Sequence, residues 1–331
     1  MNANKKSSIF DVVAGLSIAG LLLPEAVAYS NIAGLSPQSG LVALVIGLIV
    51  YGLIGRSRFA IVSSTSSSAA VLSSGLATIV ALSSPERASL AYALVFLSGI
   101  LLVIAGLFKL GEVTQFIAKP VLKGFSFGLA LSIVVKQLPS VLQVHPEHSD
   151  FFRQIWGFIT AYQDWNVYAF GMGIVTFATL KLTQSYKTIP VALLLIILGI
   201  SLNVLGYTAQ WGIHSVGHFE FVLPSASLPN LSMNSWLQLV EIALAVALIV
   251  YAESYTSIRT FALKYNDPSE PNRDLIALGV GNILSGLLKG MPLGAGYSAT
   301  SANEAAGATS KKSAWVAALA VRSEEHTSEL Q

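Results

Sequence analysis

The chain has 331 residues, of which 53% are hydrophobic and only 11% are Asp, Glu, Lys or Arg. A soluble domain carries about 25% charged residues, so this composition argues against a water-facing globular fold and for a chain solvated by lipid. The net charge of +2 gives no reason to expect a nucleic-acid partner, and the absence of cysteine excludes disulfide bonds and Cys-ligated metals.

Long apolar runs follow one another along the chain. A bilayer core needs about 20 apolar residues in a helix, whereas a barrel strand needs only about 10 residues of alternating polarity. The runs therefore predict an all-α polytopic membrane protein. Apolar segments are expected at 11–33, 39–55, 60–82, 88–108, 119–138, 165–183, 188–206, 236–256, 273–289 and 297–309, and an eleventh begins at Ser313.

The distribution of basic residues sets the expected orientation. Lys5 and Lys6 precede the first apolar run, and placing them in the cytoplasm puts most Lys and Arg residues on the same side. Arg259 and Lys264 then belong to a cytoplasmic loop after the 236–256 span. Residues 207–235 form an extracytoplasmic connection without Lys or Arg. We expect a multi-pass protein of the cell (inner) membrane with a cytoplasmic N-terminus.

Two of the apolar segments begin with polar or glycine-rich sequence. Segment 60–82 opens with a run of serine and threonine over 63–68, and the stretch 290–309 opens with three glycines and a proline. Broken helices at membrane depth are tolerated only where they line a cavity. Because helix N-termini carry free amides and partial positive charge, a pair of such segments predicts an anion site at the middle of the membrane.

Each half of the chain contains an acidic residue inside an apolar helix, followed at similar distance by one broken segment. Glu25 precedes the first broken segment and Glu253 the second. An odd number of segments separates the members of each pair, which predicts an inverted repeat of seven plus seven helices. The expected divisions are a first repeat over 1–206, the connection 207–235, an incomplete second repeat over 236–321, and a tail, 322–331.

Charged and hydroxyl residues in these helices are candidates for ion coupling. Glu25 follows Pro24, and Tyr29 lies one turn later on the same helix face. Glu253 shares a face with Ser257, which suits a proton or a sodium ion. The competing interpretation is that these are hydrogen-bonded groups with a packing role only.

The expected substrate site consists of backbone amides. In the first broken segment the donors lie around Thr65 and Ser66, and in the second they come from Tyr297, Ser298, Ala299 and Thr300. The alternative is that the small residues simply permit close helix packing. No cofactor, metal or catalytic group is expected, and the sequence gives no support to an enzyme.

Two stretches carry a family resemblance. LLLPEAVAYSNIAGLSPQSGL resembles the first-helix signature of the sulfate permease (SulP) family, bacterial relatives of solute carrier family 26, and RDLIALGVGNILSGLLKGMPLGAGYSATSANEAAGA resembles its ninth and tenth helices. The resemblance covers about 9–320. It implies fourteen helices in two inverted repeats, a core that moves against a gate, a cytoplasmic STAS domain, and transport of sulfate, bicarbonate, chloride or dicarboxylates with protons or sodium.

The same resemblance assigns roles to individual residues. It places Glu25 and Tyr29 at first-helix site positions, Thr65 and Ser66 in the third helix, Glu253 at the acidic position of the eighth, and Ser298 at the anion-facing position of the tenth. Three features depart from the family pattern: Ser63-Ser64 replaces a common Gly-Pro, Ala299 replaces a common Arg, and the eleventh helix stops after Val321, before a polar tail that resembles foreign sequence.

These observations predict a secondary active transporter of a small inorganic or carboxylate anion, coupled to H⁺ or Na⁺ and working by alternating access. Its partners would be the anion, the coupled ion, the lipid bilayer and, in the full-length protein, a second copy. One alternative is a nucleobase transporter of the same architecture, which would use acids of the eighth and tenth helices. A second alternative is a truncated fragment that does not transport.

Overall fold

The computed structural model describes residues 3–80, 86–111, 151–183, 191–213 and 224–327, with parts of 127–144. The chain forms two compact units, one made of Met1–Leu122 with Phe219–Gln331 and the other of Lys123–His218. Each unit is described by itself. The expected 119–138 span lies mostly outside the described residues.

The first unit contains eight helices and two short strands among its described residues. In chain order they are α1 (Ala3–Ala33), α2 (Pro37–Ile54), β1 (Val62–Ser63), α3 (Ser66–Ala77), α4 (Arg87–Leu107), α10 (Met233–Tyr265), α11 (Pro271–Leu287), β2 (Gly294–Ala295), α12 (Tyr297–Ala305) and α13 (Lys312–Thr327).

The second unit is also helical where it is described. It contains α6 (Phe151–Thr160), a 3₁₀ turn (Tyr162–Asp164), α7 (Val167–Thr183), α8 (Val191–Val204) and the single turn α9 (Tyr207–Gln210). The expected spans 165–183 and 188–206 are therefore confirmed as helices. The helix α6 was not predicted, because its sequence follows a polar stretch and is too short to span a bilayer.

Among the described residues, four helices are long and apolar enough to cross a membrane: Ser8–Ala33 within α1, then α2, α4 and α10. Large apolar side chains remain exposed on their outer faces, such as Leu107 and Leu248. Exposed apolar faces of this extent on long helices are what a lipid environment accommodates. The expectation of an all-α polytopic membrane fold is confirmed.

Two helix ends differ from the prediction. We expected the 236–256 span to end in a loop, but α10 continues to Tyr265, so Arg259 and Lys264 lie on its last turns. One face of these last turns is still packed, since Ile258, Phe261 and Ala262 are buried, and the helix ends only at Asn266, which adopts a left-handed conformation. The helix expected to stop at Val321 continues as α13 to Thr327.

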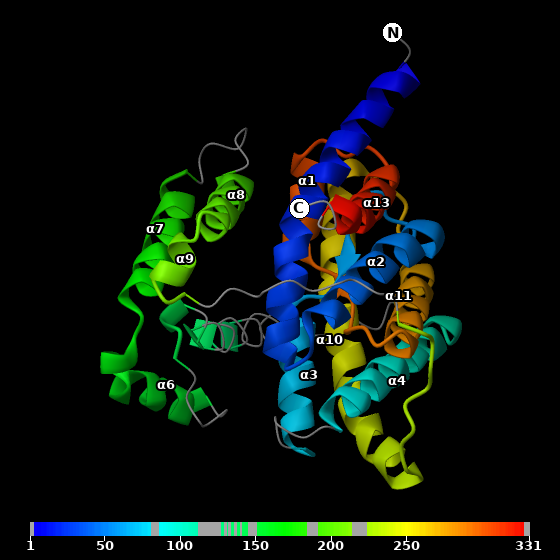
Figure 1. Ribbon diagram of the computed structural model, residues 1–331. Helices are drawn as coiled ribbons and strands as arrows, with labels where there is room; N and C mark the ends of the chain where they lie inside the picture. Colours follow the sequence, from blue (N-terminus) through cyan, green and yellow to red (C-terminus); the bar gives the residue numbers. More distant parts are fainter. Residues whose placement is uncertain are drawn as a thin grey trace. The chain divides into compact units, whose positions relative to one another are not determined.

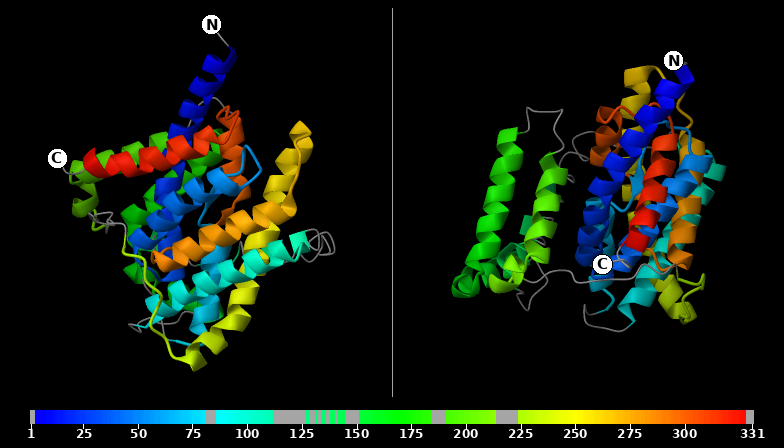
Figure 2. Two further views of the ribbon diagram at one scale, coloured as in Figure 1. Left: turned by 90° about the vertical axis from the view of Figure 1, so that its right-hand side faces the viewer. Right: turned by 45° about the horizontal axis from the view of Figure 1, so that its top comes forward.

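Helices α4 and α11 cross at very close range and lie side by side in the first unit (Figure 2). A Cβ atom added to Gly99 would lie 2.5 Å from the backbone nitrogen of Ile283, and one added to Gly279 would lie 2.7 Å from that of Val103. Glycines therefore let the two backbones touch, as in other tightly packed membrane helices.

The two interrupted segments are short helices that follow short strands. Helix α3 has 12 residues and α12 has 9, so neither spans a bilayer. Strands β1 and β2 pair antiparallel, with Val62 opposite Ala295 and Ser63 opposite Gly294. Because each strand leads directly into its helix, the two helices start side by side and run in opposite directions (Figure 1). This arrangement agrees with the predicted inverted repeat.

Candidate functional site

The N-terminal tips of α3 and α12 touch each other. A Cβ atom added to Gly296, the N-cap of α12, would lie 3.3 Å from the Cγ2 atom of Thr65, the N-cap of α3. The Ser68 hydroxyl also donates to the Pro292 carbonyl at 3.4 Å. The sequence prediction that two discontinuous helices meet tip to tip therefore agrees with the geometry.

At the α3 tip, the amide of Thr65 is not available to a ligand. It donates to the Ser68 hydroxyl at 3.2 Å, and the Ser68 amide donates to the Thr65 hydroxyl at 3.2 Å, which closes a reciprocal cap. Our expectation of a free amide at Thr65 is wrong for this reason. The first two helical amides, those of Ser66 and Ser67, have no acceptor within the helix.

At the α12 tip, the expected donor Thr300 is likewise occupied. Its amide donates to the Gly296 carbonyl at 3.1 Å, and its buried hydroxyl accepts from the Ile61 amide at 3.3 Å. Thr300 thus belongs to the packing of α12, and the prediction that its amide faces a ligand is wrong. Gly296 provides no side-chain cap, so the amides of Tyr297, Ser298 and Ala299 have no acceptor within the helix.

Side chains at the α12 tip point in two directions. Tyr297 and Ser298 are exposed, whereas Ala299 is only 3% exposed and packs in an apolar cluster with Ile18 and Leu22 of α1. Ala299 therefore contributes its amide to the tip and its methyl group to the core.

The carboxylate of Glu253, on α10, is attached to the α3 tip. The Thr65 hydroxyl donates to Glu253 Oε2 at 3.0 Å, and the Ser67 side chain also hydrogen-bonds this carboxylate. Ser67 was not among the predicted site residues. Ser67 lies in the serine run that predicts the first broken segment. The sequence alone could not distinguish a serine that hydrogen-bonds a carboxylate from a small residue that only permits close helix packing.

Glu25 and Tyr29 of α1 face the same region. The Tyr29 side chain hydrogen-bonds both the Glu25 carboxylate and Ser66, and the charge of Glu253 also acts on Tyr29. Two acidic groups from different helices thus border the α3 tip, as the sequence predicted. Tyr29 joins the first of them to a residue whose backbone amide is free.

Two serines of α10 hold the α12 tip in place. Ser257, an expected ion ligand, is buried and donates to the Gly296 carbonyl at 3.5 Å. Ser254, which was not predicted, accepts from the Ala295 amide at 2.8 Å and donates to the carbonyl of Val250. These contacts fix β2 and the start of α12 against the helix that carries Glu253.

This region combines helix N-termini with two carboxylates. Each helix N-terminus is equivalent to roughly half a positive charge. The free amides belong to Ser66, Ser67, Tyr297, Ser298 and Ala299. Within the described part of the chain, no Lys or Arg side chain contacts Glu25, Tyr29 or Glu253. Positive charge therefore comes from dipoles, and the two carboxylates can take up a proton or a metal cation.

Comparison with known proteins identifies related sequences over most of the chain. The model of the sulfate permease family matches residues 9–323. "Probable sulfate transporter MT1781" of Mycobacterium tuberculosis is 29% identical over 299 residues, which cover 90% of this chain and 53% of that protein. Human solute carrier family 26 member 6 is 27% identical over 341 residues, covering 93% of this chain and 44% of the relative.

Solved structures share the fold. SLC26A9 matches with a TM-score of 0.85 at 19% identity, over 97% of this chain and 54% of that chain. The transmembrane domain of a cyanobacterium bicarbonate transporter, BicA, matches with a TM-score of 0.80 at 18% identity, over 94% of this chain and 80% of that chain. The chain spans about half the length of the curated relatives it matches.

Proposed function

This chain belongs to the sulfate permease family, a family of transporters rather than enzymes, and from that premise we propose that it carries the anion-binding site of a secondary active transporter. The substrate is a small inorganic or carboxylate anion of the sulfate or bicarbonate type. In the complete transporter the site opens alternately to the two sides of the cell membrane.

One observation supports the proposal: the tips of α3 and α12 touch, and each helix begins with amides that have no acceptor within the helix. Five neutral donors on two converging helix dipoles bind an anion without burying a cationic side chain, which would cost several kcal/mol. Relatives described as sulfate and bicarbonate transporters support the same substrate class.

The coupled ion is assigned to the carboxylates. Glu253 receives hydrogen bonds from α3, and Glu25 connects to α3 through Tyr29. Neutralising Glu253 with H⁺ or Na⁺ removes a negative charge beside the anion, so cation and anion bind cooperatively. We also propose that the first repeat covers 1–206, the connection 207–235 and part of a second repeat 236–321, followed by a tail at 322–331.

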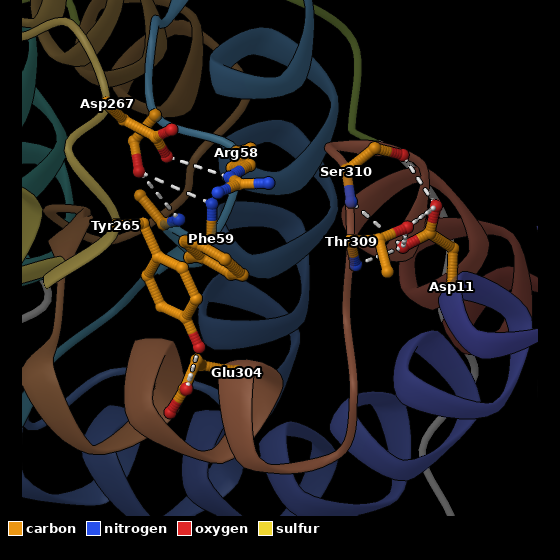
Figure 3. Close-up of polar contacts among 10 residues, drawn as sticks. Asp11, Arg58, Phe59, Tyr265, Asp267, Glu304, Thr309 and Ser310 are labelled. Atoms are coloured by element: carbon orange, nitrogen blue, oxygen red, sulfur yellow. Dashed lines mark hydrogen bonds and ion pairs between the residues drawn. The ribbon is translucent and has the colours of Figure 1, made fainter. Parts of the chain in front are cut away.

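The nucleobase alternative finds no support in the geometry. The acid that α12 provides, Glu304, accepts from Lys264 at 2.8 Å and from the Tyr265 hydroxyl, at the opposite end of the helix from the tip (Figure 3). It is therefore engaged with α10 and does not reach the free amides.

Uptake of labelled anions by a version of full family length tests the proposal. We expect uptake of bicarbonate, sulfate or fumarate to be driven by an inward proton or sodium gradient and to resist competition by excess uracil. Competition by uracil, or no uptake of any anion by a correctly inserted protein, would contradict the assignment.

A second experiment tests the coupling role. Glu253→Gln keeps the size of the side chain and its ability to accept from Thr65, but it cannot be neutralised by a cation. We expect gradient-driven uptake to fall at least tenfold in this variant, while Glu241→Gln, an exposed acid on the same helix, leaves it within twofold. Unchanged uptake by the Glu253 variant would remove Glu253 from the coupling mechanism.

A further inference from the structure

Three charged side chains that the proposed mechanism does not use are almost completely buried in the first unit. One of them, Asp274 of α11, accepts from the Tyr51 hydroxyl at 2.7 Å and from the Arg56 amide at 2.9 Å, which joins α11 to α2 and the loop after it. The other two are attached to α1. Asp11, near the cytoplasmic end of α1, is 1% exposed, and Arg87, the first residue of α4, is 2% exposed. Burying a charge is costly unless specific partners compensate for it, so each position demands an explanation.

Asp11 ties α1 to the turn that follows α12. Its carboxylate accepts from the Thr309 amide at 2.6 Å, the Ser310 amide at 3.0 Å and the Ser310 hydroxyl at 2.6 Å (Figure 3). The Thr309 hydroxyl lies 3.1 and 3.2 Å from its two oxygens. Both oxygens are thus occupied by donors from the link between α12 and α13, which lies 298 residues away along the chain.

Arg87 makes the corresponding connection at the other end of α1. Its Nη2 atom donates to the carbonyl of Ala33, the last residue of α1, at 3.4 Å and to the carbonyl of Ser73, on α3, at 3.3 Å. The Ser73 hydroxyl lies 3.4 Å from the same nitrogen. Gly34 leaves the room for this approach, since a Cβ atom there would lie 3.1 Å from Arg87 Nε.

The sign of each charge suits the helix ends that it meets. Asp11 faces amides just before the start of α13, where a helix carries partial positive charge. Arg87 faces the carbonyl of the last residue of α1 and a carbonyl in the C-terminal half of α3, toward the ends where helices carry partial negative charge. A cation at the start of its own helix, α4, is unfavourable. Arg87 is held against α1 and α3 through its Nη2 atom, whereas its Nε and Nη1 atoms are buried without a hydrogen-bond partner in the described part of the chain.

From these contacts we infer that Asp11 and Arg87 are positioning residues for the anion site. Helix α1 carries Glu25 about 21 Å along its axis from Asp11 and about 12 Å before Ala33, and Tyr29 follows about 6 Å further along. The Asp11 contacts hold α1 against the link between α12 and α13, and the Arg87 contacts hold it against α3. Together they set the distance between the acidic side chains of α1 and the two amide-bearing tips.

The inference rests on the proposed function. Two independent measurements, of distances from α1 and of anion affinity, distinguish failure of the inference from failure of the proposed function. The chain has no cysteine, so spin labels can be placed at chosen pairs of introduced cysteines. A label at exposed Leu16 of α1 is paired with one at exposed Ala305 of α12 or at exposed Ala77 of α3. Pulsed electron paramagnetic resonance then reports how narrowly α1 is held against each half-helix, and titration with sodium bicarbonate and sodium sulfate reports anion affinity.

We expect Asp11→Asn to broaden the α1–α12 distance distribution and Arg87→Gln to broaden the α1–α3 distribution. Each should weaken anion affinity about fivefold or more in the folded fraction. Asp267→Asn and Arg273→Gln are matched controls, because they remove the same charges from ion pairs near helix ends, where Asp267 is half-buried and Arg273 is exposed. They should leave both readouts unchanged.

Distributions as narrow as in the unmodified chain, or unchanged affinity in the folded fraction, would overturn the inference. If Asp11→Asn does not fold, the milder pair Thr309→Val and Ser310→Ala removes the hydroxyl donors alone and should broaden the α1–α12 distribution to a smaller extent. If the unmodified chain binds no anion, the proposed function is refuted, even when the variants broaden the distance distributions.

Discussion

At the scale of single residues, the acidic and hydroxyl groups of the site lie where intramembrane polarity predicted them. Glu25, Tyr29 and Glu253 all border the α3 tip. Placing a carboxylate inside a membrane helix costs free energy, so such a residue is rarely retained without a partner or a function. The sequence could not reveal which amides are free, since that depends on capping contacts such as the one between Thr65 and Ser68.

Thr65 has two roles: its hydroxyl donates to Glu253, and it caps the N-terminus of α3. Thr65→Val keeps the shape of the side chain but removes both the donor to Glu253 and the cap of α3. Loss of an N-cap costs about 0.5–2 kcal/mol, so we expect a lower melting temperature together with weaker coupling of anion uptake to the cation.

Thr65→Ser provides the matched control, because it retains the hydroxyl and loses only a methyl group. It should keep both properties close to those of the unmodified chain. Coupling that is intact in the valine variant would mean that Glu253 does not depend on the α3 tip.

At the scale of elements, small residues predicted close packing in general but not the particular contacts. Two glycines illustrate this: Gly294 pairs in β2, and Gly296 meets Thr65 at the tip. The β1–β2 pairing was not predicted, because two-residue strands have no periodicity that a sequence could reveal.

The contact between the tips should be sensitive to side-chain size at Gly296. A Cβ atom fits only at 3.3 Å from Thr65 Cγ2, so alanine is tolerated with a small shift, whereas valine must push α12 away from α3. We expect Gly296→Ala to retain anion binding within about threefold and Gly296→Val to weaken it more than tenfold, measured by titration of the folded protein. Equal affinities for the two variants would show that the tips need not touch.

The glycine crossing of α4 and α11 should control stability. Gly279→Ala places a methyl group 2.7 Å from the Val103 nitrogen, which forces the helices apart and should cost about 1–3 kcal/mol. Gly199→Ala on α8 is the matched control: its Cβ meets nothing within 4 Å, so helix propensity alone should make it neutral or stabilising. Thermal unfolding in detergent compares the two, and equal melting temperatures would contradict a packing role for Gly279.

At the scale of the whole molecule, composition and apolar run length were sufficient to predict a helical membrane protein. Run length could not predict where α10 ends, because the helix continues past its continuous apolar run to Tyr265 and is stopped by a C-cap rather than by polarity. Nor could it predict α6, whose ten residues resemble a loop on length alone.

The proposed orientation, with a cytoplasmic N-terminus, can be tested on the same molecule. Because the chain contains no cysteine, single cysteines report sidedness without background. In intact cells, a membrane-impermeant thiol reagent should label Ser225→Cys, in the connection 207–235, and should not label Pro268→Cys, between α10 and α11, until the cells are opened. The reverse pattern would invert the proposed topology.

The account depends on free backbone amides at the tips, and proline at Ser66 tests this most directly. Ser66 is the first residue of α3, where proline fits a helix, and Thr65 before it is already extended at ψ 155°. Ser66→Pro therefore removes one amide donor, while Ser66→Ala removes only the hydroxyl. Bicarbonate and sulfate affinities of the two folded variants should differ about tenfold or more, the expected effect of one hydrogen bond to a charged ligand. Equal affinities would contradict an anion site built from the helix tips.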